Sequence, residues 1–366
     1  MLTSLEVEGY RSLQKVRCAL GPITVVVGPN GSGKSNLYQS LKLVHAAAQG
    51  TLARVLAAEG GMPSILWAGA RKEGPRRVTL RAHAGQWSYA LELGLPVGDQ
   101  GSMFALDPLI KSERAWMLEG SRRHVILERV NHSATARDSE GGRSEILDGI
   151  SQSESVLGTF ADPQRFPMLA RLRQEILRWR FYHQLRVDSD APARRACTAT
   201  RTPVLSDDGA DLASALQTIR ENGDGNALDR AIARALQGSQ IQVESSRGQL
   251  SLELVVPGVA RPLAMHEWSD GTLRMVLLLT ALNSPRPPTL LALNEPESSL
   301  HPDVLPALGT AILEAARHTQ LWVTTHALGL AHAVSEQNDT RFYKLHMGTQ
   351  GSVLTDLHAR GEDTDR

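Results

Sequence analysis

The feature that most constrains this chain is the stretch Val25-Val26-Val27-Gly28-Pro29-Asn30-Gly31-Ser32-Gly33-Lys34-Ser35. Its β-branched run favours a strand, and the glycine-rich turn that follows opens an amphipathic helix whose apolar face carries Leu37, Leu41, Val44 and Ala48. The spacing G-x-x-x-x-G-K-S between a strand and a helix is that of a phosphate-binding loop. The chain is therefore predicted to bind a nucleoside triphosphate.

The residue types of this loop suit phosphate chemistry. Its glycines let backbone N–H groups turn toward phosphate oxygens, and the helix N-terminus adds its positive dipole end. We expect Lys34 on the β- and γ-phosphates and the Ser35 hydroxyl on Mg²⁺. The expected nucleotide-binding residues are Gly28, Pro29, Asn30, Gly31, Ser32, Gly33, Lys34, Ser35 and Asn36.

Composition narrows the possible partners. The 366 residues contain 39 Lys and Arg against 39 Asp and Glu, so any surface for nucleic acid must be a local patch. Cys18 and Cys197 lack paired or metal-type spacing and are expected to be free thiols. The N-terminus reads as a strand rather than a leader, and no apolar run reaches the roughly 18 residues of a membrane span. The sequence predicts a cytoplasmic protein without a membrane partner.

Residues 1–150 are expected to form the first part of an ATPase core. Alternating residues predict strands within Leu2 to Val27, with a turn at Gly21-Pro22, and a hairpin from Arg77 to Leu95 at a sheet edge. A further pair of strands is expected at Val125 to Val130 and at Glu145 to Leu147, with Asn131 to Gly142 as the loop between them.

Residues 151–238 are expected to be a mostly helical insertion. One helix is predicted from Leu169 through Phe181, and a second helical block, Asp211 to Leu236, is interrupted at Asn222 to Asn226. The polar stretch Asp188 to Asp208 between them is predicted to be an extended loop.

Residues 239–366 are expected to complete the core. A hairpin joins Ile241–Val243 to Leu250–Val256, and Met275 to Leu282 forms a helix buried on every side. The apolar run Thr289 to Leu293 suits a central parallel strand. A helix from Asp303 to Arg317 and a last strand, Leu321 to Thr325, bring the chain to His326.

These motifs, in this order, resemble the ATP-binding-cassette type of P-loop ATPase, and within it the RecF, SMC and OLD-like branch. The resemblance covers about residues 1–50 and 260–330. It implies an α/β fold, with a mixed sheet around the phosphate-loop helix and a helical lobe that carries a signature element. The chain looks like a stand-alone ATPase of the AAA_21 type without a fused nuclease domain.

The resemblance assigns roles to residues outside the phosphate loop. Gly9-Tyr10-Arg11-Ser12-Leu13 is similar to the element that precedes the loop in this branch, which implies that Arg11 lies near the nucleotide. Ser269-Asp270-Gly271-Thr272 is similar to the signature element. There Ser269 and Gly271, at a helix N-terminus, would hold the γ-phosphate of ATP bound to a second subunit.

The second nucleotide motif departs from the family pattern. The family usually has D-E-P-E, and this chain has Asn294-Glu295-Pro296-Glu297. Glu295 remains the candidate general base that orients the attacking water. Asn294 keeps a carbonyl oxygen near Mg²⁺ but loses a charge, which should weaken metal binding or slow turnover. One hypothesis is that Glu297 compensates for the lost carboxylate.

Three further assignments follow from the resemblance. His326 lies 31 positions after Glu295 (326 − 295 = 31). It matches the switch histidine that contacts the γ-phosphate in this branch. Ser298 to His301 would form the loop that crosses to the other subunit. Gln152 is the candidate for the glutamine loop, and so for a second Mg²⁺ contact.

An arginine-rich segment lies within the predicted insertion. Arginines beside aromatic residues suit nucleic acid, and a solvated helix face with buried aromatics is the alternative. The arginines between Arg171 and Arg201 are 171, 173, 178, 180, 186, 194, 195 and 201, with Trp179, Phe181 and Tyr182 interleaved.

Together these observations predict Mg²⁺-dependent ATP binding and slow hydrolysis by two copies that close head to tail. In this branch such a switch serves DNA repair, chromosome maintenance or defence against phage, with a separate nuclease or effector protein as partner. Three alternatives stay open. They are a transporter-type ATPase subunit, a non-catalytic ATP-sensing scaffold suggested by Asn294, and a P-loop kinase.

Overall fold

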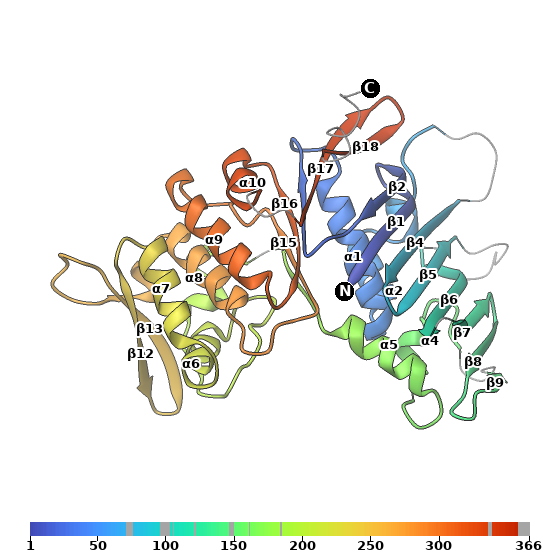
Figure 1. Ribbon diagram of the computed structural model, residues 1–366, viewed down its shortest axis with the longest axis horizontal. Coiled ribbons are helices and arrows are strands. Elements are labelled where there is room, and N and C mark those ends of the chain that lie inside the picture. Colours follow the sequence, from blue (N-terminus) through green and yellow to red (C-terminus); the bar gives the residue numbers. More distant parts are fainter. Residues whose placement is uncertain are drawn as a thin grey trace. The chain divides into compact units, whose positions relative to one another are not determined.

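The computed structural model describes residues 1–70, 76–95, 103–104, 106–120, 122–145, 150–160, 162–183, 185–335 and 339–357. The chain divides into two compact units. The first unit comprises Met1–Trp179 and Arg341–Arg366, and the second comprises Arg180–Thr340. Each unit has its own helices and strands and is described by itself (Figure 1).

The first unit is built on an antiparallel sheet with the strand order β2-β1-β4-β5-β6-β7-β8-β9. The strands are β1 (Leu2–Tyr10), β2 (Leu13–Ala19), β4 (Arg77–Ala84), β5 (Trp87–Gly94), β6 (Leu109–Glu119), β7 (Arg122–Val130), β8 (Ser133–Arg137) and β9 (Arg143–Glu145). Alternate residues of β1 and β4 are buried, as expected of a sheet with one covered face.

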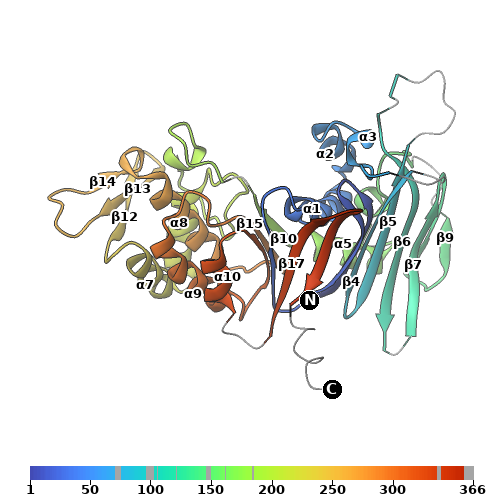
Figure 2. The same ribbon diagram turned by 90° about the horizontal axis from the view of Figure 1, so that it is seen from above.

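Helices cover this face of the sheet. They are α1 (Lys34–Gln49), α2 (Leu52–Ala58), α3 (Met62–Ile65), α4 (Val156–Thr159) and α5 (Pro167–Leu177). Helix α1 contacts β1 and β4, while α5 contacts β7 and β8, and both lie on the same side of the sheet in Figure 2. The phosphate-loop helix is thereby held against a rigid layer.

A shorter set of strands completes the first unit. Strand β3 (Ile23–Val27) neighbours β17 (Thr340–Gly348), which forms an antiparallel hairpin with β18 (Gly351–Asp356). Ala19 and Tyr343 exchange two hydrogen bonds, each 2.9 Å, which fasten this C-terminal hairpin to the end of β2.

The second unit contains a parallel strand pair and a small antiparallel sheet. Strand β10 (Trp179–Tyr182) enters it, and β15 (Leu290–Asn294) pairs in parallel with β16 (Gln320–Thr325). The small sheet has the order β11-β13-β12, with β14 paired to β13. Its strands are β11 (Cys197–Thr198), β12 (Gln240–Ser246), β13 (Gln249–Val255) and β14 (Leu263–Ala264).

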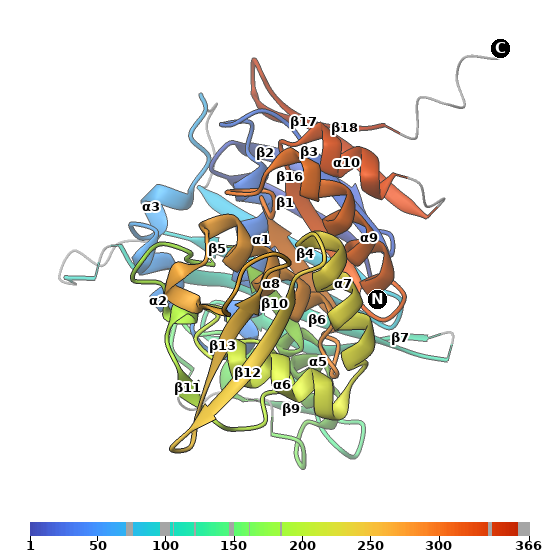
Figure 3. The same cartoon turned by 90° about the vertical axis from the view of Figure 1, so that its left-hand side faces the viewer.

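Helices surround these strands. The α-helices are α6 (Leu212–Asn222), α7 (Gly225–Ala235), α8 (Asp270–Leu282), α9 (Leu305–Ala315) and α10 (Leu328–Val334), and the short 3₁₀ helices are η1 (Pro192–Arg194), η2 (Met265–Glu267) and η3 (Pro302–Val304). Figure 3 shows α6 and α7 beside the hairpin of β12 and β13, which they contact. Every residue from Leu273 to Leu282 in α8 is buried, which confirms the expected helix without an exposed face.

Several local predictions were wrong. The helix expected to run through Phe181 ends at Leu177, and Trp179–Tyr182 is strand β10. The hairpin of β4 and β5 lies inside the sheet rather than at its edge, because β1 and β6 pair with its outer sides. The loop expected at Asn131 to Gly142 contains strand β8. The loop expected at Asp188 to Asp208 contains the 3₁₀ helix η1 and strand β11. Leu147, the end of another expected strand, lies outside the described residues.

The prediction of free thiols is confirmed. Cys18 and Cys197 are free thiols, and burial raises the pKa of the Cys18 thiol to about 12. Within the part of the chain that the structure describes, no helix combines the length and apolarity needed to cross a bilayer.

Candidate nucleotide-binding site

The phosphate loop has the backbone that its glycines predict. Gly31 and Gly33 take positive φ angles of 77° and 101°, and α1 begins directly after Gly33. The N-cap residue is Gly33, and among the described residues no side chain caps this helix N-terminus. A helix start of this kind can receive phosphate oxygens.

Close packing fixes the shape of the loop. A Cβ on Gly28 would lie 2.2 Å from the Leu345 carbonyl oxygen of β17, and one on Gly33 would lie 2.4 Å from Ser352 Oγ. A Cβ on Gly31 would meet nothing within 4 Å. The loop is therefore packed on one side, by the C-terminal hairpin, and has room beside Gly31.

The polar atoms of the loop fit a triphosphate. Lys34 Nζ donates to the carbonyl oxygens of Gly28 (2.8 Å) and Pro29 (3.0 Å), which folds the ammonium group over the loop. Ser32 Oγ is buried and has no hydrogen-bond partner in the described structure. Ser35, the expected Mg²⁺ ligand, is exposed at the first turn of α1.

The turn that carries Arg11 is joined to the phosphate loop. Asn36 Nδ2 donates to Ser12 Oγ (2.8 Å), and Ser352 Oγ donates to the Ser32 carbonyl oxygen and shares a hydrogen bond with Ser12 Oγ, each at 2.7 Å. Sequence reasoning missed Ser352, because nothing local indicates that a residue so late in the chain reaches the loop.

Arg11 itself is held by a neighbour that the sequence did not indicate. Its φ is 46°, and its guanidinium pairs with Glu59 at 2.8 Å. Tyr10 Oη also donates to Glu59, at 2.9 Å, and burial followed by the Glu59 charge raises the pKa of Tyr10 far above its ordinary value. Glu59 thus orients the residue that the sequence placed near the nucleotide.

Gln152 lies in a loop fastened to the large sheet. Ile110 N donates to its carbonyl oxygen, and the buried Arg129 donates to the carbonyls of Ser151 and Glu154 on either side. The Gln152 side chain is exposed. These contacts fix the loop and leave the assignment of a glutamine loop a prediction.

In the second unit, Asn294 and Glu295 end strand β15. Asn294 is buried, and its Oδ1 accepts a 2.6 Å hydrogen bond from Thr324 Oγ1 of β16. Glu295 has a φ of 47°, an uncommon backbone for a non-glycine residue. Its N–H donates to the Thr324 carbonyl (2.8 Å), and its carbonyl accepts from Arg274 Nη2 of α8 (3.2 Å). The backbone of the candidate base is thus held from two sides.

The signature segment begins helix α8 as predicted. Ser269 Oγ accepts from Thr272 N at 3.1 Å and so caps the helix. A Cβ on Gly271 would lie 2.8 Å from the Ser299 carbonyl oxygen, so the helix start closely approaches the loop after Glu297. Ser299 also has a positive φ, of 65°.

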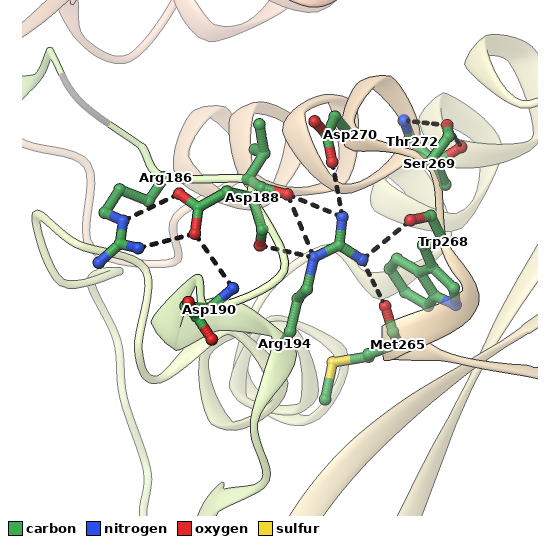
Figure 4. A network of polar contacts seen from close by, with 10 residues as sticks. Arg186, Asp188, Asp190, Arg194, Met265, Trp268, Ser269, Asp270 and Thr272 are labelled. Carbon is green, nitrogen blue, oxygen red and sulfur yellow. Dashed lines mark hydrogen bonds and ion pairs between the residues drawn. The ribbon is translucent and has the colours of Figure 1, made fainter.

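Arg194 fastens the start of α8, a role that the sequence did not reveal. Only 7% of its side chain is exposed, and its guanidinium donates to five acceptors (Figure 4). These are the carbonyl oxygens of Val187, Asp188, Met265 and Trp268 and the carboxylate of Asp270. Since Asp270 directly follows Ser269, Arg194 joins the loop at residues 187–188 to the signature.

We expect Arg194→Ala to lower the free energy of unfolding by about 2–4 kcal/mol, because it removes the donor to the carbonyl oxygens of two buried residues, Met265 and Trp268, and of half-buried Val187. Urea denaturation measures this loss. Arg186→Ala is the matched control, since Arg186 makes only an exposed ion pair with Asp188 and should leave the denaturation midpoint unchanged. Equal denaturation midpoints for the wild type and both variants would show that Arg194 does not stabilise the start of α8.

The arginine-rich segment does not offer its aromatic residues for stacking. Trp179, Phe181 and Tyr182 are buried. Arg173 donates to the Ala48 carbonyl, and Arg171 donates to Gln86. The arrangement agrees with buried aromatics beside a polar face, and DNA binding by this segment stays a prediction.

We expect Asn294→Asp to raise ATP turnover about tenfold, because a carboxylate here adds a full charge beside Mg²⁺. The Thr324 hydroxyl can donate to a carboxylate as it does to the amide oxygen, so the fold should be retained. Phosphate release as a function of Mg²⁺ concentration measures the effect. Unchanged turnover would instead favour compensation by another group, such as Glu297.

The glycine loop, the capped signature helix and the acidic end of β15 are the parts of a P-loop ATPase of the ATP-binding-cassette type. A family model described as "AAA domain, putative AbiEii toxin, Type IV TA system" matches residues 23–331. The chain belongs to this family, which confirms the resemblance and the predicted fold class.

Solved structures show the same fold. The SMC head domain from Thermotoga maritima matches with a TM-score of 0.52 and 16% identity, over 97% of this chain and 98% of that one. The Smc head bound to the C-terminal winged-helix domain of ScpA gives a TM-score of 0.54 and 15% identity, over 98% and 99% of the two chains. At these low sequence identities, the similarity shows a shared fold and nothing further.

One curated relative matches over a short stretch. The OLD nuclease of Thermus scotoductus (strain ATCC 700910 / SA-01) is 43% identical over 44 residues, which span 12% of this chain and 8% of that protein. The match thus covers a small part of the nuclease.

Proposed function

We propose that this chain binds ATP with Mg²⁺ and hydrolyses it slowly, and that two copies close head to tail around two nucleotides. The observation that carries the proposal is the phosphate loop, with its uncapped helix N-terminus and with Lys34 folded over it. Family membership supports nucleotide binding and ATPase activity in general terms.

The proposed chemistry assigns a role to each residue. Lys34 neutralises charge on the β- and γ-phosphates, and Ser35, with Asn294 through water, would hold the Mg²⁺ that neutralises further charge. Glu295 orients the attacking water, while His326 contacts the γ-phosphate. Ser269 and Gly271 of the second copy would approach the same γ-phosphate with the N-terminus of α8.

We propose that this cycle acts as a switch in DNA repair, chromosome maintenance or defence against phage, through a separate effector or nuclease. One matched structure is an SMC head bound to a domain of another protein, ScpA, which makes a protein partner a reasonable expectation here. A non-catalytic ATP sensor is the second candidate, and the amide at position 294 is the observation that favours it.

Complementation between two inactive variants tests the head-to-tail arrangement. Lys34→Met removes only the ammonium group, whereas Ser269→Asp keeps a helix cap but repels phosphate. Each variant alone should lack ATP hydrolysis. Their mixture should recover a measurable part of it, because one of the two shared sites then has an intact loop and an intact signature.

The readouts are phosphate release and mass by light scattering, with and without ATP and Mg²⁺. A mixture as inactive as its components, beside an active wild type, would contradict sharing of the site between copies. If the wild type binds ATP but releases no phosphate, the result would favour the non-catalytic ATP sensor over the hydrolysing switch.

A further inference from the structure

Glu297 is a buried carboxylate with an unusual set of partners. Its Oε1 accepts from Thr325 Oγ1 (2.6 Å) and from the backbone N–H groups of His326 (2.9 Å) and Ala327 (3.3 Å). His326 Nδ1 lies 3.1 Å from the same oxygen. Only 5% of the Glu297 side chain is exposed, against 46% for His326. A carboxylate is thus fixed beneath an open imidazole ring.

This contact influences which nitrogen of the His326 ring carries the proton. Because an ionised carboxylate only accepts hydrogen bonds, it favours a proton on the ring nitrogen 3.1 Å away. In the neutral ring, this favours the form with the proton on Nδ1 and leaves Nε2 as the acceptor. Carboxylates that hold the far nitrogen of a working histidine fix its tautomer and its orientation in this way.

Glu297 interacts electrostatically with a buried cation of the second unit. Burial lowers the pKa of the Arg274 guanidinium, and the nearby charges of Glu297 and Glu295 oppose this effect. Arg274 Nη1 donates to the Leu185 carbonyl oxygen, and Nη2 donates to that of Glu295. The carboxylate is therefore near enough to a buried cation of α8 to interact with its charge, and it lies 3.1 Å from the ring nitrogen at the end of β16.

We propose that Glu297 is a positioning residue for His326: it holds the imidazole in its Nδ1–H form and aims Nε2 at the γ-phosphate. This role rests on the proposed function and differs from the hypothesis that Glu297 replaces a missing Mg²⁺ ligand. When Nε2 takes up a proton from solvent, the ring becomes an imidazolium that donates from Nε2 to a phosphate oxygen, while its Nδ1–H faces Glu297.

A double-mutant cycle tests whether Glu297 acts through the ring. Glu297→Gln keeps the shape and removes the charge, and we expect kcat for ATP to fall about 10- to 100-fold with KM nearly unchanged. In a His326→Ala background the same substitution should change kcat less than about twofold. An equal loss in both backgrounds would overturn the proposal.

The ring tautomer gives a readout that does not depend on hydrolysis. Nitrogen NMR of the neutral imidazole, assigned by loss of its signals in His326→Gln, should report the Nδ1–H form in the wild type. Thr325→Val is the control, because it removes one donor to Glu297 and leaves the ring contact. An Nε2–H ring in the wild type would overturn the proposal even if the protein hydrolyses ATP. An inactive wild type with an Nδ1–H ring would contradict only the proposed hydrolysis.

Discussion

Lys34→Met is expected to weaken ATP binding at least about 100-fold. The ammonium group would make charge-assisted hydrogen bonds with two phosphates, each contributing about 1.5–3 kcal/mol, and a tenfold change in Kd corresponds to about 1.4 kcal/mol. Nζ donates to the main-chain carbonyl oxygens of Gly28 and Pro29. Methionine keeps the length of the side chain and its helix propensity. Calorimetric titration with ATP measures the loss.

Lys42→Met is the matched control. Lys42 lies on the same helix, about two turns beyond the phosphate loop, and is partly exposed. It should bind ATP like the wild type. If Lys34→Met binds ATP as tightly as this control does, then the loop does not hold the triphosphate in the expected way.

Glu295→Gln is expected to lower ATP turnover by about 10²–10³-fold while ATP binding persists. A positioned general base typically contributes 10²–10⁴-fold, and Gln keeps the shape without the capacity to take a proton. The bonds of Glu295 to Thr324 and Arg274 are made by its backbone, so this substitution should leave these two bonds in place. Single-turnover phosphate release and ATP titration separate the two effects.

The same variant distinguishes the two candidate functions. In a hydrolysing switch, Glu295→Gln should accumulate ATP-bound dimers in light scattering, because the step that opens them is slowed. Glu314→Gln is the control and should behave like the wild type, because the side chain of Glu314 of α9 makes only an exposed ion pair, with Arg234 of α7, among the interactions of the described residues. For a sensor, turnover and dimerisation would be unaltered by either substitution.

Much of the fold was predictable because local patterns decide it. The runs Thr289–Leu293 and Leu321–Thr325 were each predicted to be a strand, and they are β15 and β16, which pair in parallel; the helix without a polar face is α8. Trp179–Tyr182 was mispredicted as helix, because four apolar and basic residues directly after a helix fit either period. The interior place of β4 and β5 depends on pairing with β1 and β6, which no local pattern encodes.

The sequence by itself determined the phosphate loop, the signature helix and the acidic end of β15, because glycine spacing, a helix cap and an apolar strand act over a few residues. Only the tertiary structure decided which groups hold them. Ser352 reaches the loop, Arg194 fastens the signature and Glu297 meets His326 through contacts between separate parts of the chain. A buried polar group needs a hydrogen-bond partner, and the tertiary fold decides which group lies close enough to be that partner.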